Sequence, residues 1–161
     1  GVTVEKGCDV LISVAEKMPY MKFGFAGVIA DELKNIRKTE NVVFYGNVDP
    51  QRVKELMDDA DIFVFLSRFY GEGFSCALTE AMADGLPCVV SDWAANKDMV
   101  GCDGGIVLSN VNTDSCFNAI SKLKDDMKLR ERMSVRNKRN VRSFYTDRAV
   151  RGIYKKYYYS L

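Results

Sequence analysis

Short apolar runs recur along this chain, separated by stretches in which apolar residues return every three or four positions. The runs are rich in Val, Ile and Phe and have the length of β-strands. A run without alternating polar residues, such as Ile62-Phe-Val-Phe-Leu66, is typical of a strand that is buried on both faces of a sheet. Strands are therefore predicted over residues 21–28, 41–45, 61–66, 87–91 and 104–108.

The stretches between these runs predict helices. Val10, Leu11, Val14 and Ala15 have helical spacing, and Asp49-Pro50 combines an N-cap residue with proline in the first turn. The alternation of strands and helices predicts an α/β fold, with a doubly wound parallel sheet, helices on both faces and further helices at the C-terminus. Helices are predicted over residues 8–17, 31–37, 50–58, the segment after 75, 96–100, 113–126, 128–142 and 146–159.

Composition narrows the chemistry that this chain can perform. A hydrophobic content of 47% suffices for one core, so residues 1–161 are expected to form one domain. The absence of histidine excludes a Ser-His-Asp triad, a Cys-His pair and any histidine acid–base step. The five cysteines form no CxxC pair, and we expect all of them to be reduced core residues. Without a long apolar run or a leader pattern, the chain is expected to be soluble, unprocessed and cytoplasmic.

Charge is distributed unevenly, although the net charge is only +1. From Lys128 onward, eleven Lys and Arg face two Asp and Glu, a net charge of +9, and the preceding residues carry −8. Two interpretations of this basic helical tail, residues 128–161, stay open. Its helices cover the sheet and dock on a further domain, or its cations and tyrosines bring the protein to an anionic membrane surface. No recognisable module points to nucleic acid, and no such partner is expected.

The stretch FYGEGFSCALTEAMADGLPCVVS, residues 69–91, contains the candidate site. A glycine-flanked turn joins the strand predicted over 61–66 to a helix. The turn is therefore expected at the carboxyl edge of the sheet, where open α/β folds bind ligands. Glu72 in the turn and Glu80 in the helix are separated by a little over two helical turns. The two carboxylates are thus expected to act at different points of one site.

Five segments resemble the C-terminal, nucleotide-sugar-binding domain of retaining glycosyltransferases of the GT-B fold, in the family 4 group (glycosyl transferases group 1). They occur in the order of the family over about the first hundred residues. The resemblance implies a Rossmann-like domain that is one half of a GT-B enzyme. The matching segments are EKGCDVLI from Glu5, NVVFYG from Asn41, DADIFV from Asp59, EGFSCALTEAMADGLP from Glu72, and SDWAANKDMV from Ser91.

The resemblance implies roles for individual residues. Glu72, the catalytic candidate, is placed at the donor sugar and Glu80 at the ribose hydroxyls, and a carboxylate accepts hydrogen bonds from both kinds of group. Lys6 is expected to pair with the diphosphate and to stabilise the leaving nucleotide. Arg68 is either a phosphate ligand or a solvated side chain. The backbone amides of Gly73, Phe74 and Ser75 open a helix and are expected to bind the diphosphate. The turn formed by Gly46, Asn47 and Val48 is expected to pack against the base.

The same resemblance implies sugar transfer from a nucleotide-sugar to a glycan or lipid-linked acceptor, with retention at the anomeric carbon. A hexose or N-acetylhexosamine is expected to be added to a bacterial surface polysaccharide, such as lipopolysaccharide with its O-antigen, or capsule. The donor is expected to be a UDP-sugar, with a GDP-sugar as the alternative, and no cofactor is expected. Because the acceptor-binding domain of the family normally comes first, the chain is expected to be a C-terminal domain that binds donor and does not turn over alone.

Two other functions stay open: a nucleotide-sugar epimerase of related fold, and a non-catalytic nucleotide-binding α/β module. Asp59-Ala-Asp61 matches a metal-binding pattern of another glycosyltransferase fold. It precedes its strand and so falls at the edge opposite to the candidate site, and no metal is expected. Where the family commonly has a glycine pair, this chain has Ala94-Ala95, and these side chains are expected to narrow the sugar pocket.

Overall fold

Parallel strands form two sheets in this computed structural model, which describes residues 1–37, 39–146 and 148–150. In the first sheet, β1 (Phe23–Ala26) pairs with β2 (Val42–Gly46). In the second, β4 (Cys88–Ser91) lies between β3 (Phe63–Phe65) and β5 (Gly105–Leu108). The predicted class of parallel α/β fold is confirmed. The division into two sheets is a feature that the hydrophobic pattern did not indicate.

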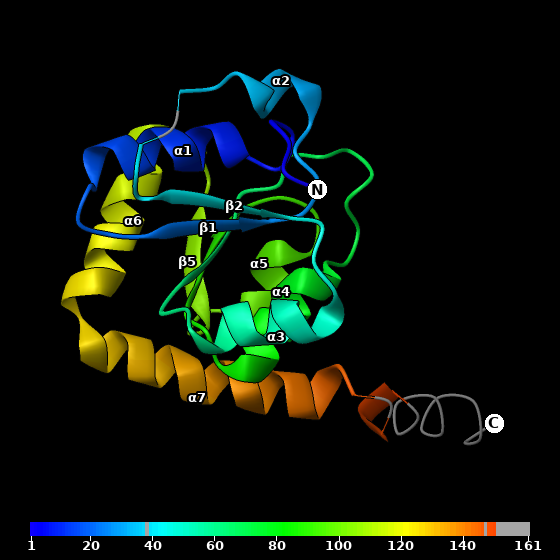
Figure 1. Cartoon of the computed structure of the whole chain (residues 1–161). Helices are drawn as coiled ribbons and strands as arrows, with labels where there is room; N and C mark the ends of the chain where they lie inside the picture. Colours follow the sequence, from blue (N-terminus) through cyan, green and yellow to red (C-terminus); the bar gives the residue numbers. More distant parts are fainter. Residues whose placement is uncertain (38, 147, 151–161) are drawn as a thin grey trace.

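Helices cover both faces of the strands. On one face α1 packs beside α6, and on the other α4 packs along α7, with α3 and α5 beside α4 (Figure 1). Each helix begins and ends within one or two residues of its predicted range, except α2, which ends three residues early. Short polar helices have few contacts that could extend them. The helices are α1 (Cys8–Lys17), α2 (Asp31–Lys34), α3 (Pro50–Asp58), α4 (Cys76–Asp84), α5 (Asn96–Val100), α6 (Thr113–Asp125) and α7 (Met127–Phe144).

Strand β4 separates two hydrophobic cores. Val89 points into the core beneath α1 and α6, whereas Cys88 and Val90 point into the core beneath α4, α5 and α7. This alternation follows from the two-residue period of a strand. All three side chains are fully buried, as expected for a strand with helices over both faces. The expectation of helices on both faces of the sheet is therefore confirmed.

Helix α7, the first part of the basic tail, is anchored by one buried amide. The Asn137 Nδ2 donates to the carbonyl oxygens of Leu86 and Gly104, each at 2.8 Å. Glycine is needed for this approach, because a Cβ on Gly104 would lie 2.1 Å from the Asn137 Oδ1. The contact ties α7 to the loops that enter β4 and β5. Most of the helix predicted over 146–159 lies outside the described residues.

The cysteines have different environments, and all five are free. Cys88 and Cys116 are buried and Cys8 is half-buried, whereas Cys76 and Cys102 are exposed. The expectation that all five are core residues is wrong for Cys76 and Cys102, because the first turn of α4 and the turn after α5 face solvent. Among the described residues, no helix has the length and apolar character needed to cross a membrane.

Replacing Asn137 with Ala is expected to lower the free energy of unfolding by about 2 kcal/mol, because the buried carbonyls of Leu86 and Gly104 lose their shared donor. Arg139→Ala, on the exposed face of α7, is the matched control and is expected to change it by less than about 0.5 kcal/mol. Urea unfolding measures both variants. Equal stability of the two would show that the Asn137 bridge does not stabilise the fold.

Thiol reactivity is expected to follow burial. Desolvation raises the pKa of the Cys88 and Cys116 thiols to about 12, so almost none of either is present as reactive thiolate at about pH 8. A colorimetric disulfide reagent is expected to modify the exposed Cys76 and Cys102 rapidly in the folded chain. Cys88 and Cys116 are expected to react only after denaturation, and modification of all five at one rate would contradict this packing.

Candidate functional site

The first seven residues connect the carboxyl ends of the two sheets. Just beyond β1, the Val2 N–H donates to the Val28 carbonyl oxygen at 2.8 Å. Just beyond β3, the Glu5 carbonyl oxygen accepts from the Arg68 N–H at 2.6 Å. The N-terminal segment, which carries Lys6, and the loop after β3, which carries Arg68, thereby lie at one edge of the fold.

Gly7 positions both Lys6 and the start of α1. Its φ of 71° is in the left-handed region, and a Cβ at this position would lie 2.5 Å from the Leu66 Cβ. A glycine is therefore required for the segment to lie against the end of β3. Since α1 begins at Cys8, its first-turn amides open at this edge. The Lys6 ammonium has no ion-pair partner within the described residues, so it is free to attract an anion.

Arg68 ties the loop after β3 to the N-terminal segment. Its guanidinium Nη2 donates to the Val4 carbonyl oxygen at 2.9 Å and to the Asp9 Oδ1 at 3.3 Å. The side chain is thus engaged by protein groups, and only partly exposed. Contact between Arg68 and a phosphate stays a prediction, and it would require the guanidinium to share its donors with Val4 and Asp9.

The Glu72 carboxylate is held by a serine at the end of β3. The Ser67 Oγ donates to the Glu72 Oε2 at 3.0 Å and accepts from the Phe69 N–H at 3.3 Å. The Ser67 carbonyl oxygen in turn accepts from the Ser91 Oγ at 2.6 Å. Ser67 is fully buried, and Ser91 nearly so. This network joins the ends of β3 and β4 to the loop that carries Glu72.

Asn96 extends the same network into α5. The side chain is fully buried, and its Nδ2 donates to the Ser91 Oγ at 3.2 Å. Its Oδ1 is buried without a hydrogen-bond donor in the described part of the chain, an arrangement that is rare and costly. Ser67, Ser91 and Asn96 were not identified as site residues from the sequence, because single polar residues of this kind carry no local signal.

Trp93 also positions the loop before α4. Its Nε1 donates to the Phe69 carbonyl oxygen at 2.8 Å, and the Ala95 N–H donates to the Gly73 carbonyl oxygen at 3.4 Å. The structure shows a partly exposed side chain that fixes the loop between β3 and α4 through a hydrogen bond.

The N-terminus of α4 follows that loop directly. Ser75 is its N-cap, and the Ser75 Oγ accepts from the Leu78 N–H at 3.3 Å. Gly73 and Phe74 are exposed, and no atom lies within 4 Å of a Cβ built on Gly73. The Phe74 ring meets that of Tyr145 edge-on, with 5.1 Å between centroids. The first turn of α4 therefore presents amides that the helix itself cannot satisfy.

The remaining candidates lie further from Glu72. Glu80 is exposed in the second turn of α4. Gly46 ends β2 with a φ of 70°, and its carbonyl oxygen accepts from the Gly27 N–H at 2.7 Å. Asn47 and Val48 follow at the carboxyl end of the first sheet. The structure thus groups Lys6, Arg68, Glu72 and the start of α4 around the end of β3, and places the turn at 46–48 beyond the other sheet.

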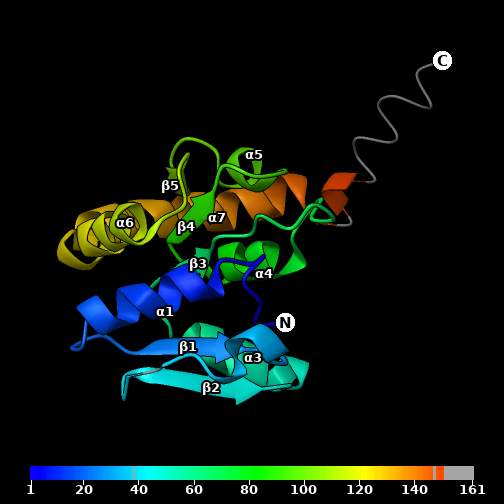
Figure 2. The ribbon, with the colours of Figure 1, turned by 90° about the horizontal axis from the view of Figure 1, so that it is seen from above.

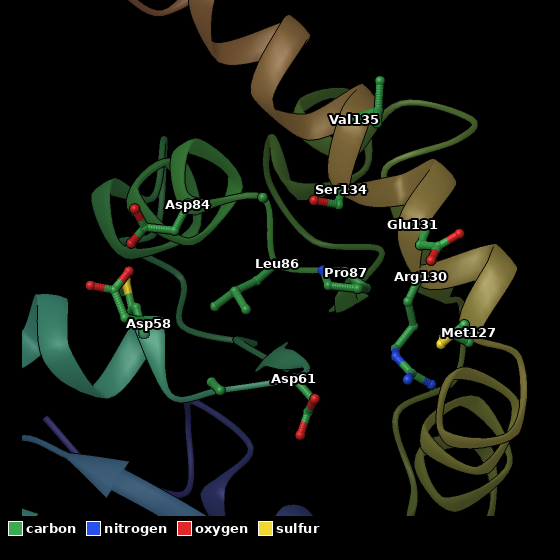
Figure 3. Close-up of a pocket in the computed structure, with 13 residues that line it drawn as sticks. Asp58, Asp61, Asp84, Leu86, Pro87, Met127, Arg130, Glu131, Ser134 and Val135 are labelled. Carbon is green, nitrogen blue, oxygen red and sulfur yellow. The ribbon is translucent and has the colours of Figure 1, made fainter.

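A cavity of about 440 Å³ lies at the opposite, amino edge, between the ends of α3 and α4 and the side of α7 (Figure 3). Its charged residues include Asp58, Asp61, Asp84 and Arg130. Asp61 therefore lies at the far edge of β3 from Glu72. Within the described residues, no three His, Cys, Asp or Glu side chains are grouped in a way that would hold a metal ion.

The family model described as glycosyl transferases group 1 matches residues 2–140. The putative glycosyltransferase EpsF of Bacillus subtilis (strain 168) is 38% identical over 71 residues, which are 44% of this chain and 17% of that protein. The alpha-galactosylglucosyldiacylglycerol synthase of Streptococcus pneumoniae (strain ATCC BAA-255 / R6) is 32% identical over 101 residues, 56% of this chain and 26% of that protein. This chain spans between 17% and 33% of the length of such curated relatives.

Solved structures share the fold. Anabaena Alr3699/HepE in complex with UDP superposes with a TM-score of 0.83 at 17% identity, over 99% of this chain and 47% of that one. The C-terminal domain of LpcC, a glycosyl transferase group 1 family protein from Francisella tularensis, superposes with a TM-score of 0.76 at 19% identity, over 91% and 83% of the two chains. Both support a Rossmann-like half of a GT-B fold. Since the family model covers most of its length, this chain belongs to the glycosyl transferases group 1 family.

Proposed function

We propose that this chain is the donor-binding domain of a retaining glycosyltransferase of family 4, and that its donor is a UDP-sugar. The observation that carries the proposal is the arrangement around the end of β3. There Lys6, the N-termini of α1 and α4, and the Ser67-bound carboxylate of Glu72 lie at one edge. A cation and helix amides suit a diphosphate, and a fixed carboxylate suits sugar hydroxyls. The solved complex of HepE with UDP supports the same ligand class.

The diphosphate is proposed to lie against the first turn of α4. Unsatisfied amides and the helix dipole favour an anion there, and the exposed Gly73 lets the phosphate approach the backbone closely. Lys6 then supplies the positive charge. Because charge builds up on the diphosphate as the nucleotide leaves, an ammonium at this position lowers the energy of the transition state more than that of the bound donor.

Glu72 is proposed to contact the donor sugar. Ser67 donates to its Oε2, and its Oε1 is proposed to accept from a sugar hydroxyl. Glu80, exposed on α4, is proposed to accept from both ribose hydroxyls, and the turn formed by Gly46, Asn47 and Val48 to pack against the base. A hexose or N-acetylhexosamine fits these polar contacts. No role in this scheme requires histidine, which the chain lacks.

The acceptor is proposed to be a glycan or lipid-linked glycan of a bacterial surface polysaccharide, such as lipopolysaccharide or capsule, held largely by a further domain. The greater length of the relatives and the glycolipid named in one of them support this. A cytoplasmic protein that contacts the membrane peripherally through the basic surface of α7 fits such an acceptor. The apolar side of α7 is used for packing, with Met133 and Val141 buried. Five basic residues of the helix are exposed: Lys128, Arg132, Lys138, Arg139 and Arg142.

Calorimetry with UDP, GDP and UDP-glucose tests the donor site. UDP is expected to bind, and Glu80→Ala is expected to weaken UDP binding about 10-fold to 100-fold, the range for losing hydrogen bonds to a charged group. Glu72→Gln is expected to leave UDP binding unchanged and to weaken UDP-glucose. Glu131→Ala, at the opposite edge, is the control and is expected to change neither. No binding of any nucleotide would refute the donor-domain proposal, whereas UDP binding unaffected by Glu80→Ala would refute only the ribose role.

Ser67→Ala tests whether the serine orients Glu72. Without the Oγ donor, Glu72 is expected to lose its fixed direction, and the affinity for UDP-glucose to fall about 5-fold while that for UDP stays constant. Ser121→Ala on α6 serves as the serine control. An equal loss of affinity for UDP and UDP-glucose would indicate that Ser67 supports the edge as a whole instead of Glu72.

A further inference from the structure

Three consecutive backbone amides before α4 have no partner inside the fold. The N–H groups of Gly73, Phe74 and Ser75 donate no hydrogen bond to a described residue, although the Gly73 carbonyl oxygen accepts from the Ala95 N–H at 3.4 Å. No described atom lies within 4 Å of a Cβ built on Gly73, so neighbouring side chains leave this glycine open. A loop that contains glycine has many conformations to lose, so other residues must hold its amides in one direction.

The loop is held from two sides. Toward β3, the Glu72 carboxylate accepts from the Ser67 Oγ at 3.0 Å. Toward α4, the side chain that anchors the loop is Phe74, which is 49% exposed. Among the described residues its ring meets only that of Tyr145, edge-on, with 5.1 Å between centroids and 68° between planes. An edge-to-face pair of this kind is favourable beyond the area that it buries.

Tyr145, the C-cap of α7, is itself fixed in place. Its N–H donates to the Val141 carbonyl oxygen at 2.9 Å, and its ring packs against the core beneath α4, α5 and α7. Burial, and then the charge of Asp98 in α5, raise the pKa of the Tyr145 hydroxyl. The half-buried ring therefore lies where the end of α7 approaches both α4 and α5.

Helix α7 contacts α4 at both of its ends. A Cβ on Gly85, the C-cap of α4, would lie 2.6 Å from the Ser134 Oγ, and the other end meets Tyr145 through Phe74. Eleven positions separate Phe74 from Gly85, and eleven separate Ser134 from Tyr145. Each span is about 16 Å in a helix, so both contacts fit one antiparallel pair. In the view from above, α7 runs beside α4 and ends next to the loop before it (Figure 2).

We propose that Tyr145 is a positioning residue of the donor site, which through the Phe74 ring holds the amides at the start of α4 in the direction that the diphosphate needs. The inference rests on the proposed function and adds to it a residue that does not touch the ligand. Asn137 anchors α7 to the loops before β4 and β5, so Tyr145 fixes Phe74 relative to the sheet. Amides that are already directed lose less conformational entropy when an anion binds.

Calorimetry with UDP on variants of the 161-residue chain tests this proposal. Tyr145→Ala is expected to weaken UDP binding about 3-fold to 10-fold, the range for loss of an aromatic pair. Tyr145→Phe keeps the ring and is expected to bind UDP as the unaltered chain does. Tyr145→Leu, which keeps an apolar side chain against the core, is expected to weaken binding as Tyr145→Ala does. Phe144→Ala is the control and is expected to change nothing, because the exposed Phe144 ring meets Tyr145 but not Phe74 in the described part of the chain.

A double-mutant cycle with Phe74→Ala separates positioning from a purely structural role. If Tyr145 acts through Phe74, Tyr145→Ala is expected to weaken UDP binding less than about 2-fold once residue 74 is alanine, even if it still lowers the melting temperature. UDP binding that Tyr145→Ala leaves unchanged, or an equal loss with and without the Phe74 ring, would overturn this inference alone. Failure of the unaltered chain to bind UDP would refute the proposed function, and the inference with it.

Discussion

The site depends on one backbone contact, in which the N-terminal segment lies against the ends of β1 and β3. Gly7 packs closely against Leu66, and the Glu5 carbonyl oxygen accepts a hydrogen bond from the Arg68 N–H. The two sheets share no backbone ladder in the described residues, and this segment links their carboxyl ends through backbone hydrogen bonds. Lys6, α1 and the loop before α4 therefore reach one edge together, and a larger residue at 7 would move all three.

Around that contact, buried polar groups fix the direction of the Glu72 carboxylate. The series Asn96, Ser91, Ser67 and Glu72 links the start of α5, the end of β4 and the loop after β3, and each step is a hydrogen bond of 3.2 Å or less. Buried polar groups of this kind are costly unless they are paired, so the network favours a single arrangement. A preorganised carboxylate needs little rearrangement when a ligand binds, which is the condition that a donor site must meet.

Much of the fold was predictable from local patterns, and the exceptions have a common cause. The helix over residues 8–17 and the strands near 42–46 and 88–91 lie where the hydrophobic periodicity predicted them. This periodicity can be recognised within a few neighbouring residues of the sequence. The exposure of Cys76 and Cys102 and the hydrogen bond of Trp93 were not predicted. Each depends on which neighbouring loop covers the residue, and composition does not carry that information.

The sequence by itself determined the type and order of the elements and the spacing of Glu72 and Glu80, since hydrophobic period, capping and turn residues act along neighbouring positions. Only the tertiary structure decided that Ser67 holds Glu72, that Arg68 is shared by Val4 and Asp9, and that Asn137 bridges two loops. It also decided which strand edges stay unpaired. These features join residues that are distant in the chain or depend on the order of strands in space, and no local pattern specifies either.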